Sequence, residues 1–185
     1  MFVINTLATS QAMVQAAIIV AGTTPNQRAS NVVRLSDLTP EDAQHLVDKN
    51  TLRFDTEPFV EGPPLNQRRV AIISTAGLHP ADQDNFDLRD TGYRVIPGSY
   101  NADELVMSHS SVNFDRTGFQ QDINIVFPID RLRELEAAGE IGSVADYHYS
   151  FMGAGWEPLE IEATCHQLAG LLKEDQVNAA LLVPV

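Results

Sequence analysis

Two continuous apolar runs dominate the pattern of hydrophobic and polar positions along this chain. Residues 68–75 begin with two arginines and continue as Val-Ala-Ile-Ile-Ser-Thr, and residues 179–185 read Ala-Ala-Leu-Leu-Val-Pro-Val. Apolar runs of this kind, rich in β-branched residues, are typical of strands that are buried on both faces of a sheet. We therefore predict two central strands at these positions.

Weaker patterns predict the remaining elements. Shorter strands are expected at 93–97, 104–108 and 122–127, the last because its polar and apolar positions alternate. Helices are expected at 40–49, 130–138 and 157–174, where apolar residues recur at helical spacing. Extended or irregular chain is expected in the proline-rich stretch 54–65, the turn 76–80 and the aromatic stretch 142–155.

This order of elements predicts the fold class and the domain organisation. Strands that alternate with helices favour a layered α/β/α domain with a mainly parallel sheet. A chain of 185 residues fits one ordinary domain, which we place at residues 31–185. Residues 1–30 are rich in Ala, Thr, Gln and Asn and are expected to be a poorly ordered or non-native extension. They have no basic segment before their apolar cluster, so a secretory signal is not expected.

Composition narrows the range of functions. The chain carries 12 Lys and Arg against 25 Asp and Glu, a net charge of −13, which repels nucleic acids and anionic membrane surfaces. No apolar run approaches the roughly 20 residues that span a bilayer. Cys165 is the single cysteine, which rules out an internal disulfide and suits the reducing cytoplasm. We expect a cytoplasmic protein that binds neither nucleic acid nor membrane.

A cluster of polar residues follows the predicted strand 104–108. If the strands that end at residues 75, 108 and 183 are parallel neighbours, their following loops meet at one edge of the sheet, where α/β proteins place their ligands. The polar residues at this predicted edge are His79, Ser108, His109, Ser110, Asn113, Asp115 and Arg116. We expect them to line a small-molecule pocket.

Each candidate has two interpretations that the residues alone leave open. His109 is either a general base or oriented hydrogen-bond donor, or a residue that ties its loop to a backbone carbonyl. Asp115 and Arg116 either hold a zwitterionic or carboxylate substrate, or form one of the adjacent charge pairs that are common in turns.

Other chemistries are less well supported by the motifs. A hydrolase built from Ser108 or Ser110 with His109 and Asp115 lacks a Gly-x-Ser-x-Gly motif. A metal site formed by His79, His109 and His148 lacks the usual ligand spacing, so no metal ion and no bound cofactor are expected. Cys165 lies on the apolar face of the last predicted helix, where a small buried residue fits better than a nucleophile.

Five segments in order resemble a known family. They are Val70–His79, Ser108–Arg116, Asp122–Arg133, His148–Gly153 and Ala180–Val185. Together they are similar to the selenoprotein B family of glycine, sarcosine and betaine reductases, which is related to D-proline reductase. The resemblance extends over about residues 33–185 and implies a reductase of this type.

The resemblance also implies where the nucleophile lies. In similar small proteins the strand that matches 181–185 continues into a selenocysteine, so we expect one directly after Val185, with a helix and a strand further on. The chain as given is then truncated and inactive, and its catalytic group is absent. In the intact protein the selenolate would attack carbon next to nitrogen and cleave the C–N bond, with a thiol or selenoprotein as electron donor. His109 would donate or accept protons, and His79, Ser108, Ser110, Asp115 and Arg116 would bind substrate.

A second function of a different class stays open. The loop Ser108–Arg116 of a non-catalytic binding or assembly subunit would recognise a small ligand or a partner surface instead. A sheet that lacks its carboxyl-terminal elements would expose an edge, which favours a homo-oligomer.

Overall fold

The structure, a computed structural model, describes residues 3–4, 34–49, 61–111 and 116–185. Several expectations fall outside these residues: the extended segment up to residue 60, the side chains of Asn113 and Asp115, and nearly all of the expected extension 1–30. The division of the chain at residue 30 stays a prediction.

The central sheet confirms the two strands predicted from the apolar runs. Strand β2 (Arg69–Ser74) lies in its middle. It pairs in parallel with β8 (Ala179–Val183) on one side and with β7 (Tyr147–Phe151) on the other. The short β6 (Ser143–Val144) pairs with β2 before β7 does.

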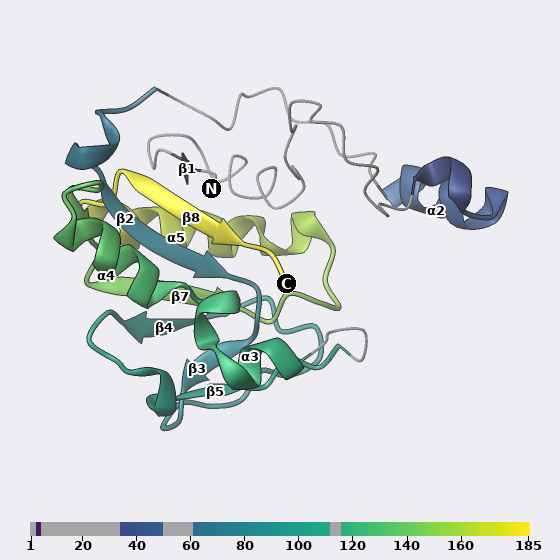
Figure 1. Ribbon diagram of the computed structural model, residues 1–185. Helices are drawn as coiled ribbons and strands as arrows, with labels where there is room; N and C mark the ends of the chain where they lie inside the picture. Colours follow the sequence, from purple (N-terminus) through teal and green to yellow (C-terminus); the bar gives the residue numbers. More distant parts are fainter. Residues whose placement is uncertain (1–2, 5–33, 50–60, 112–115) are drawn as a thin grey trace.

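Both outer strands of this sheet are antiparallel. Strand β4 (Tyr93–Pro97) pairs with β7, and the two-residue β1 (Val3–Ile4) pairs with β8. The sheet order is β1-β8-β2-β7-β4, and its central pairings are parallel (Figure 1). The predicted α/β class with a mainly parallel sheet is therefore confirmed.

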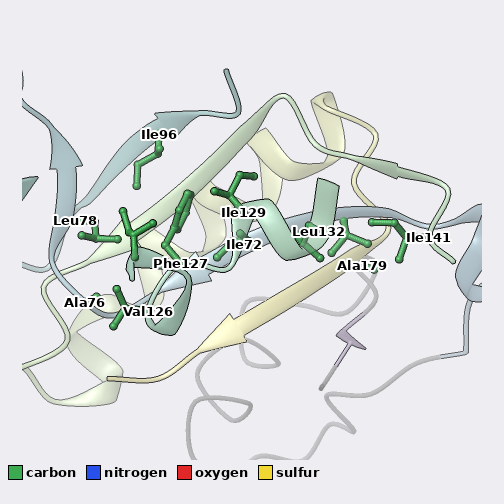
Figure 2. Packing of buried hydrophobic residues seen from close by; sticks show 12 residues of the cluster. Ile72, Ala76, Leu78, Ile96, Val126, Phe127, Ile129, Leu132, Ile141 and Ala179 are labelled. Atoms are coloured by element: carbon green, nitrogen blue, oxygen red, sulfur yellow. The ribbon is translucent and has the colours of Figure 1, made fainter. Parts of the chain in front are cut away.

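Alternation along β2 divides the core into two layers. Val70 and Ile72 pack on the side of helix α4 (Ile129–Ala137), together with Phe127 and Leu132. Figure 2 shows this cluster, with Ile72, Phe127, Ile129 and Leu132 side by side. Ala71 and Ile73 point to the other face, where they meet Leu168 and Leu172 of helix α5 (Glu162–Glu174). Because successive side chains of a strand point to opposite faces, one apolar run supplies both cores.

A second, two-stranded sheet corrects the expected position of the strand at 104–108. Strand β5 (Leu105–Met107) exists, but it pairs antiparallel with β3 (Leu78–Pro80) instead of joining the central sheet in parallel. The predicted turn at 76–80 is therefore wrong for its second half. The turn that follows β2 is short, and Gly77 within it has a φ of +64°.

Two further predictions are wrong for identifiable reasons. Residues 122–127 contain the 3-10 helix η4 (Ile123–Ile125) instead of a strand, because the Asp122 carboxylate accepts a hydrogen bond from the Asn124 N–H and caps a helical turn. The stretch 142–155 contains β6 and β7 instead of an irregular loop. Four of the five β7 residues are buried, and its aromatic side chains suit a strand in the middle of a sheet.

The remaining predicted helices are confirmed, and the elements that were not predicted are short. Helix α2 (Pro40–Lys49) and helix α4 are confirmed, and Gly139 follows α4 at φ +71°. The last predicted helix consists of the 3-10 helix η5 (Pro158–Ile161) followed by α5. The other elements are α3 (Thr117–Gln121), η1 (Leu35–Asp37), η2 (Leu65–Gln67) and η3 (Ala102–Glu104). Within the described ranges, no helix has both the length and the apolar character to cross a bilayer.

Candidate functional site

Three segments meet where β2 and β7 end. The Gly77 N–H donates a hydrogen bond to the carbonyl oxygen of Phe151 (2.8 Å), which joins the turn after β2 to the end of β7. The Ser108 N–H donates to the Gly77 carbonyl oxygen (3.0 Å), which attaches the segment after β5 to the same turn. The polar loop, defined here as Ser108–Ser111, therefore lies at the carboxyl edge of the sheet, although β5 itself is not part of that sheet.

Gly153 fixes how closely these segments approach one another. Its φ of +78° lies in the left-handed region, and a Cβ at this position would lie 2.1 Å from the Thr75 carbonyl oxygen. The same Cβ would lie 3.1 Å from Nε2 of His109. The backbone after β7 thus fits tightly between Thr75 and the imidazole, which only glycine permits.

His109 is the most deeply buried residue of the polar loop, with 5% of its surface exposed. The Ser111 N–H donates to its Nδ1 (3.1 Å), so hydrogen bonding assigns the proton of the neutral ring to Nε2. Burial, and to a lesser extent the Arg116 cation, lower the pKa of His109 below its usual 6.5. At neutral pH the imidazole is therefore uncharged, and Nε2 faces the Gly153 backbone.

Arg116 lies outside the polar loop in the sequence and stabilises the backbone of the loop by hydrogen bonds. Its Nη2 donates to the carbonyl oxygens of His109 and Ser111, the second at 3.2 Å. The guanidinium therefore holds the loop that carries the imidazole and places positive charge beside it. Whether it also binds an anionic substrate group stays a prediction.

The two serines of the polar loop have different environments. The Ser108 hydroxyl accepts a hydrogen bond from the Phe86 N–H (2.9 Å), so it connects the loop to the segment before β4. Ser110 is exposed, and its hydroxyl donates to the sulfur of Met152 at 3.5 Å. Ser110 is thus the accessible hydroxyl of the pair.

His79 belongs to the small sheet. It is buried in β3, its Nδ1 lies 2.8 Å from the Pro80 carbonyl oxygen, and its ring meets the edge of Phe86 at 6.2 Å. Phe86 is thus the residue that His79 and Ser108 share. The predicted substrate-binding role of His79 stays untested, as does that of Asp115, which lies outside the described residues.

Thr75 is a site residue that the sequence analysis missed. Its N–H donates to the Val183 carbonyl oxygen (3.1 Å), and its Oγ1 accepts a hydrogen bond from the Val185 N–H (2.8 Å). It also contacts Gly153. The sequence does contain a signal for Thr75, because a residue with a hydroxyl group directly follows an apolar strand.

The alternatives raised by the sequence find little support in this geometry. His148 is fully buried in β7, where its Nδ1 accepts from the Ile72 N–H (3.0 Å), and burial lowers its pKa to about 4. Among the described residues, no group of three or more His, Cys, Asp or Glu side chains is placed to hold a metal ion. Burial, followed by the nearby Glu162 charge, raises the pKa of the Cys165 thiol to about 11, so it is a poor nucleophile at neutral pH.

These features define an α/β domain with a buried, uncharged histidine at the carboxyl edge of its parallel strands. Residues 49–185 match the family model described as Glycine/sarcosine/betaine reductase selenoprotein B (GRDB). The chain belongs to this family, and the resemblance seen in the sequence is confirmed.

Three relatives illustrate the match. The D-proline reductase subunit gamma of Acetoanaerobium sticklandii is 36% identical over 120 residues, which cover 64% of this chain and 49% of the relative. The sarcosine reductase complex component B subunit beta of Peptoclostridium acidaminophilum is 30% identical, over 74% of this chain and 35% of the relative. The glycine reductase complex component B subunit gamma of Symbiobacterium thermophilum is also 30% identical, over 70% and 31%.

The lengths of these relatives limit what the likeness shows. The matched part of this chain covers about half of the D-proline reductase subunit and about a third of the other two. The relatives are by name subunits or components of reductases. No solved structure matches this chain significantly.

Proposed function

We propose that this protein is a reductase subunit that cleaves a C–N bond of a small amino acid or amine, with a selenocysteine directly after Val185 as the nucleophile. The observation that carries the proposal is the set of contacts that leads from Val185 to His109 in a chain of this family. Thr75 holds the Val185 N–H, Gly153 lies against Thr75, and His109 lies against Gly153. A residue that follows Val185 starts from this edge of the sheet.

The proposed reaction has three balanced steps. The selenolate attacks carbon next to a positively charged nitrogen, the C–N bond breaks, and the nitrogen keeps the electron pair of that bond and becomes a neutral amine. A thiolate of the electron donor then attacks selenium, and the carbon leaves with the Se–C electron pair and takes up a proton. A second donor thiol reduces the resulting selenium–sulfur bond, so the donor loses two electrons and ends as a disulfide.

His109 supplies the proton in the second step. Because it is uncharged at neutral pH and carries its proton on Nε2, it can donate that proton to the departing carbon, and the second donor thiol returns a proton to Nε2 when it ionises for the third step. Arg116 holds the loop of His109 in place and, with Asp115, binds the charged groups of the substrate. The thiol or selenoprotein donor is a protein partner in the intact complex, in line with relatives that are complex components.

The test uses the selenium-containing protein with its in-frame continuation, dithiothreitol as donor, and glycine, sarcosine, betaine and D-proline as substrates. The readout is release of ammonia or an amine from glycine, sarcosine and betaine, and formation of the ring-opened primary amine from D-proline. His109→Ala is expected to lower turnover about 10²–10⁴-fold, which is the usual contribution of a proton-transfer group. His45→Ala, an exposed histidine on α2, is the matched control and should leave turnover unchanged.

A second prediction concerns the pKa of His109. Replacing Arg116 with Gln removes the cation that disfavours imidazolium, so the His109 pKa should rise, while burial keeps it below 6.5. Imidazole NMR titration of this chain measures it, with Arg89→Gln as the control. An unchanged His109 pKa in Arg116→Gln, or unchanged turnover in His109→Ala, would contradict the proposed site.

The alternative of a non-catalytic binding or assembly subunit has one supporting observation, since the relatives are parts of complexes. It predicts no C–N cleavage by the selenium-containing protein with any of the four substrates. Under that alternative, substitutions in the polar loop would change binding of a ligand or a subunit only.

A further inference from the structure

An apolar pocket lies on the α5 side of the carboxyl edge of the sheet. The ends of β2 and β8 form one part of it, and the segment from the end of β7 into α5 forms the rest. Its lining includes Ile73, Phe151, Trp156, Ile161, Cys165 and Leu182. The room inside the pocket amounts to about 50 Å³, which fits a group of only a few non-hydrogen atoms.

The lining residues restrict the chemistry of a ligand. None of them carries a charge at neutral pH, and Thr75 contributes the one hydroxyl group among them. A charged group that entered would lose its hydration without gaining a partner, which is costly. The part of a ligand that enters this pocket must therefore be uncharged and mainly hydrocarbon.

Trp156 adds the requirement that a ligand carry a hydrogen-bond acceptor. Its indole Nε1 is buried, and the structure gives it no hydrogen-bond partner, although a buried indole N–H usually has one. The ring packs against Ile161 and Cys165 and lines the pocket. A ligand oxygen that accepts from Nε1 would satisfy this donor.

We infer that this pocket is a binding site for a small uncharged aliphatic group that carries a carbonyl-type oxygen. The hydrocarbon part lies among Ile73, Cys165 and Leu182, and the oxygen accepts a hydrogen bond from Trp156 Nε1. The inference does not depend on selenium chemistry, because every residue it uses is present in this chain.

The chain offers a direct measurement, because Trp156 is its single tryptophan. The indole N–H therefore gives one signal in a ¹⁵N–¹H NMR spectrum. The probes are acetamide, propionamide, butyramide and pentanamide, which share an amide oxygen and differ by one methylene each. A saturable downfield shift of the indole proton is expected, with about fourfold tighter binding per added methylene until the pocket is full. Butylammonium, which is charged and has no acceptor, should not bind.

Variants at Cys165 test the location. Cys165→Leu fills the pocket and is expected to abolish the saturable shift. Cys165→Ala, which enlarges the pocket, should move the best-binding amide to a longer chain. Ala163→Leu adds the same side chain at an exposed position of the same helix and should bind like the unmodified protein.

Two results would overturn the inference: no saturable shift with any amide in the folded protein, or unchanged binding in Cys165→Leu together with an unchanged chain-length preference in Cys165→Ala. Binding that survives while C–N cleavage is absent would refute the proposed function alone. Cleavage without amide binding would refute the pocket alone.

Discussion

At the scale of single residues, His148 shows how a polar side chain can take the place of a strand hydrogen bond. Its imidazole is fully buried, and Nδ1 accepts from the Ile72 N–H, a backbone donor in the middle of β2. The ring also meets Phe127 edge-on, with centroids 5.5 Å apart. The histidine is therefore held uncharged in the core, and burial lowers its pKa to about 4.

This environment predicts a pH-dependent stability. In the unfolded chain His148 protonates near pH 6.5, whereas the folded protein resists protonation down to about pH 4. The contribution of His148 to the free energy of unfolding is therefore complete above pH 6.5. As the pH falls from 6.5 to 4, that free energy decreases by about 3 kcal/mol. Urea unfolding at pH 7.0, 5.5 and 4.5 should show a smaller decline for His148→Phe than for the unmodified protein.

The same variant should be less stable at pH 7. The phenylalanine ring has no acceptor, so the Ile72 N–H would be buried without a partner, at a cost of about 1–3 kcal/mol. His45→Phe is the control for loss of an exposed histidine. An identical pH dependence in the unmodified protein and His148→Phe would show that His148 is not the titrating group.

At the scale of elements, strands made of apolar residues were easier to predict from the sequence than a strand that contains polar residues. Strand β8 and the interior of β2 are apolar, so both strands were readable from the sequence, although the last three residues of β8 are only partly buried. Strand β7 was missed because His148 and Ser150 look polar, although both are buried and bonded to the backbone N–H groups of Ile72 and Leu78. Burial of polar groups depends on distant partners, which a local pattern does not contain.

The polar loop lies at the predicted edge of the sheet, but the strand pairing that was expected to bring it there is wrong. Its position was predicted from a parallel β5, whereas antiparallel pairing with β3 brings it to Gly77. Both arrangements bring the end of β5 to the same turn. Thr75 was missed because its function depends on Val185, 110 positions away in the chain.

The close contact at the end of β7 predicts opposite effects for two glycines. Gly153→Ala would place a Cβ 2.1 Å from the Thr75 carbonyl oxygen at a φ of +78°, which should cost about 2–4 kcal/mol. Gly170→Ala, in α5, meets nothing within 4 Å and should stabilise the protein by about 0.5–1 kcal/mol. Urea unfolding measures both. Equal effects of the two substitutions would argue against the tight approach described here.

At the scale of the whole molecule, the two ends of the sheet have different tasks. The site lies at the carboxyl ends of the strands, whereas Arg69 ties the amino ends together. Its guanidinium lies 2.5 Å from the Asp175 carboxylate and 3.0 Å from that of Asp146, and it donates to the Val144 carbonyl oxygen at 2.8 Å. The Arg69 side chain thus connects its own strand to two segments that are far away in the sequence, one at Val144 and Asp146 and the other at Asp175.

Arg69 should therefore matter for stability and not for the site. Arg69→Ala leaves the mostly buried Asp175 without its cation and is expected to cost about 2–4 kcal/mol. Arg131→Ala, which removes an exposed pair with Glu134, should cost less than about 1 kcal/mol. Unfolding followed by Trp156 fluorescence gives both values. A comparable loss in the two variants, or a changed His109 titration in folded Arg69→Ala, would contradict this division.

The break between β6 and β7 sets a constraint on how the chain length can vary. Both strands pair with β2, and only Ala145 and Asp146 separate them from Val144 to Tyr147. One inserted or deleted residue there would exchange the two faces of β7, so that Tyr149 would meet Phe127 and His148 would meet Leu168. We therefore expect homologues to differ in length in the exposed segment around Asn101 and not at the connection that contains the buried Ala145.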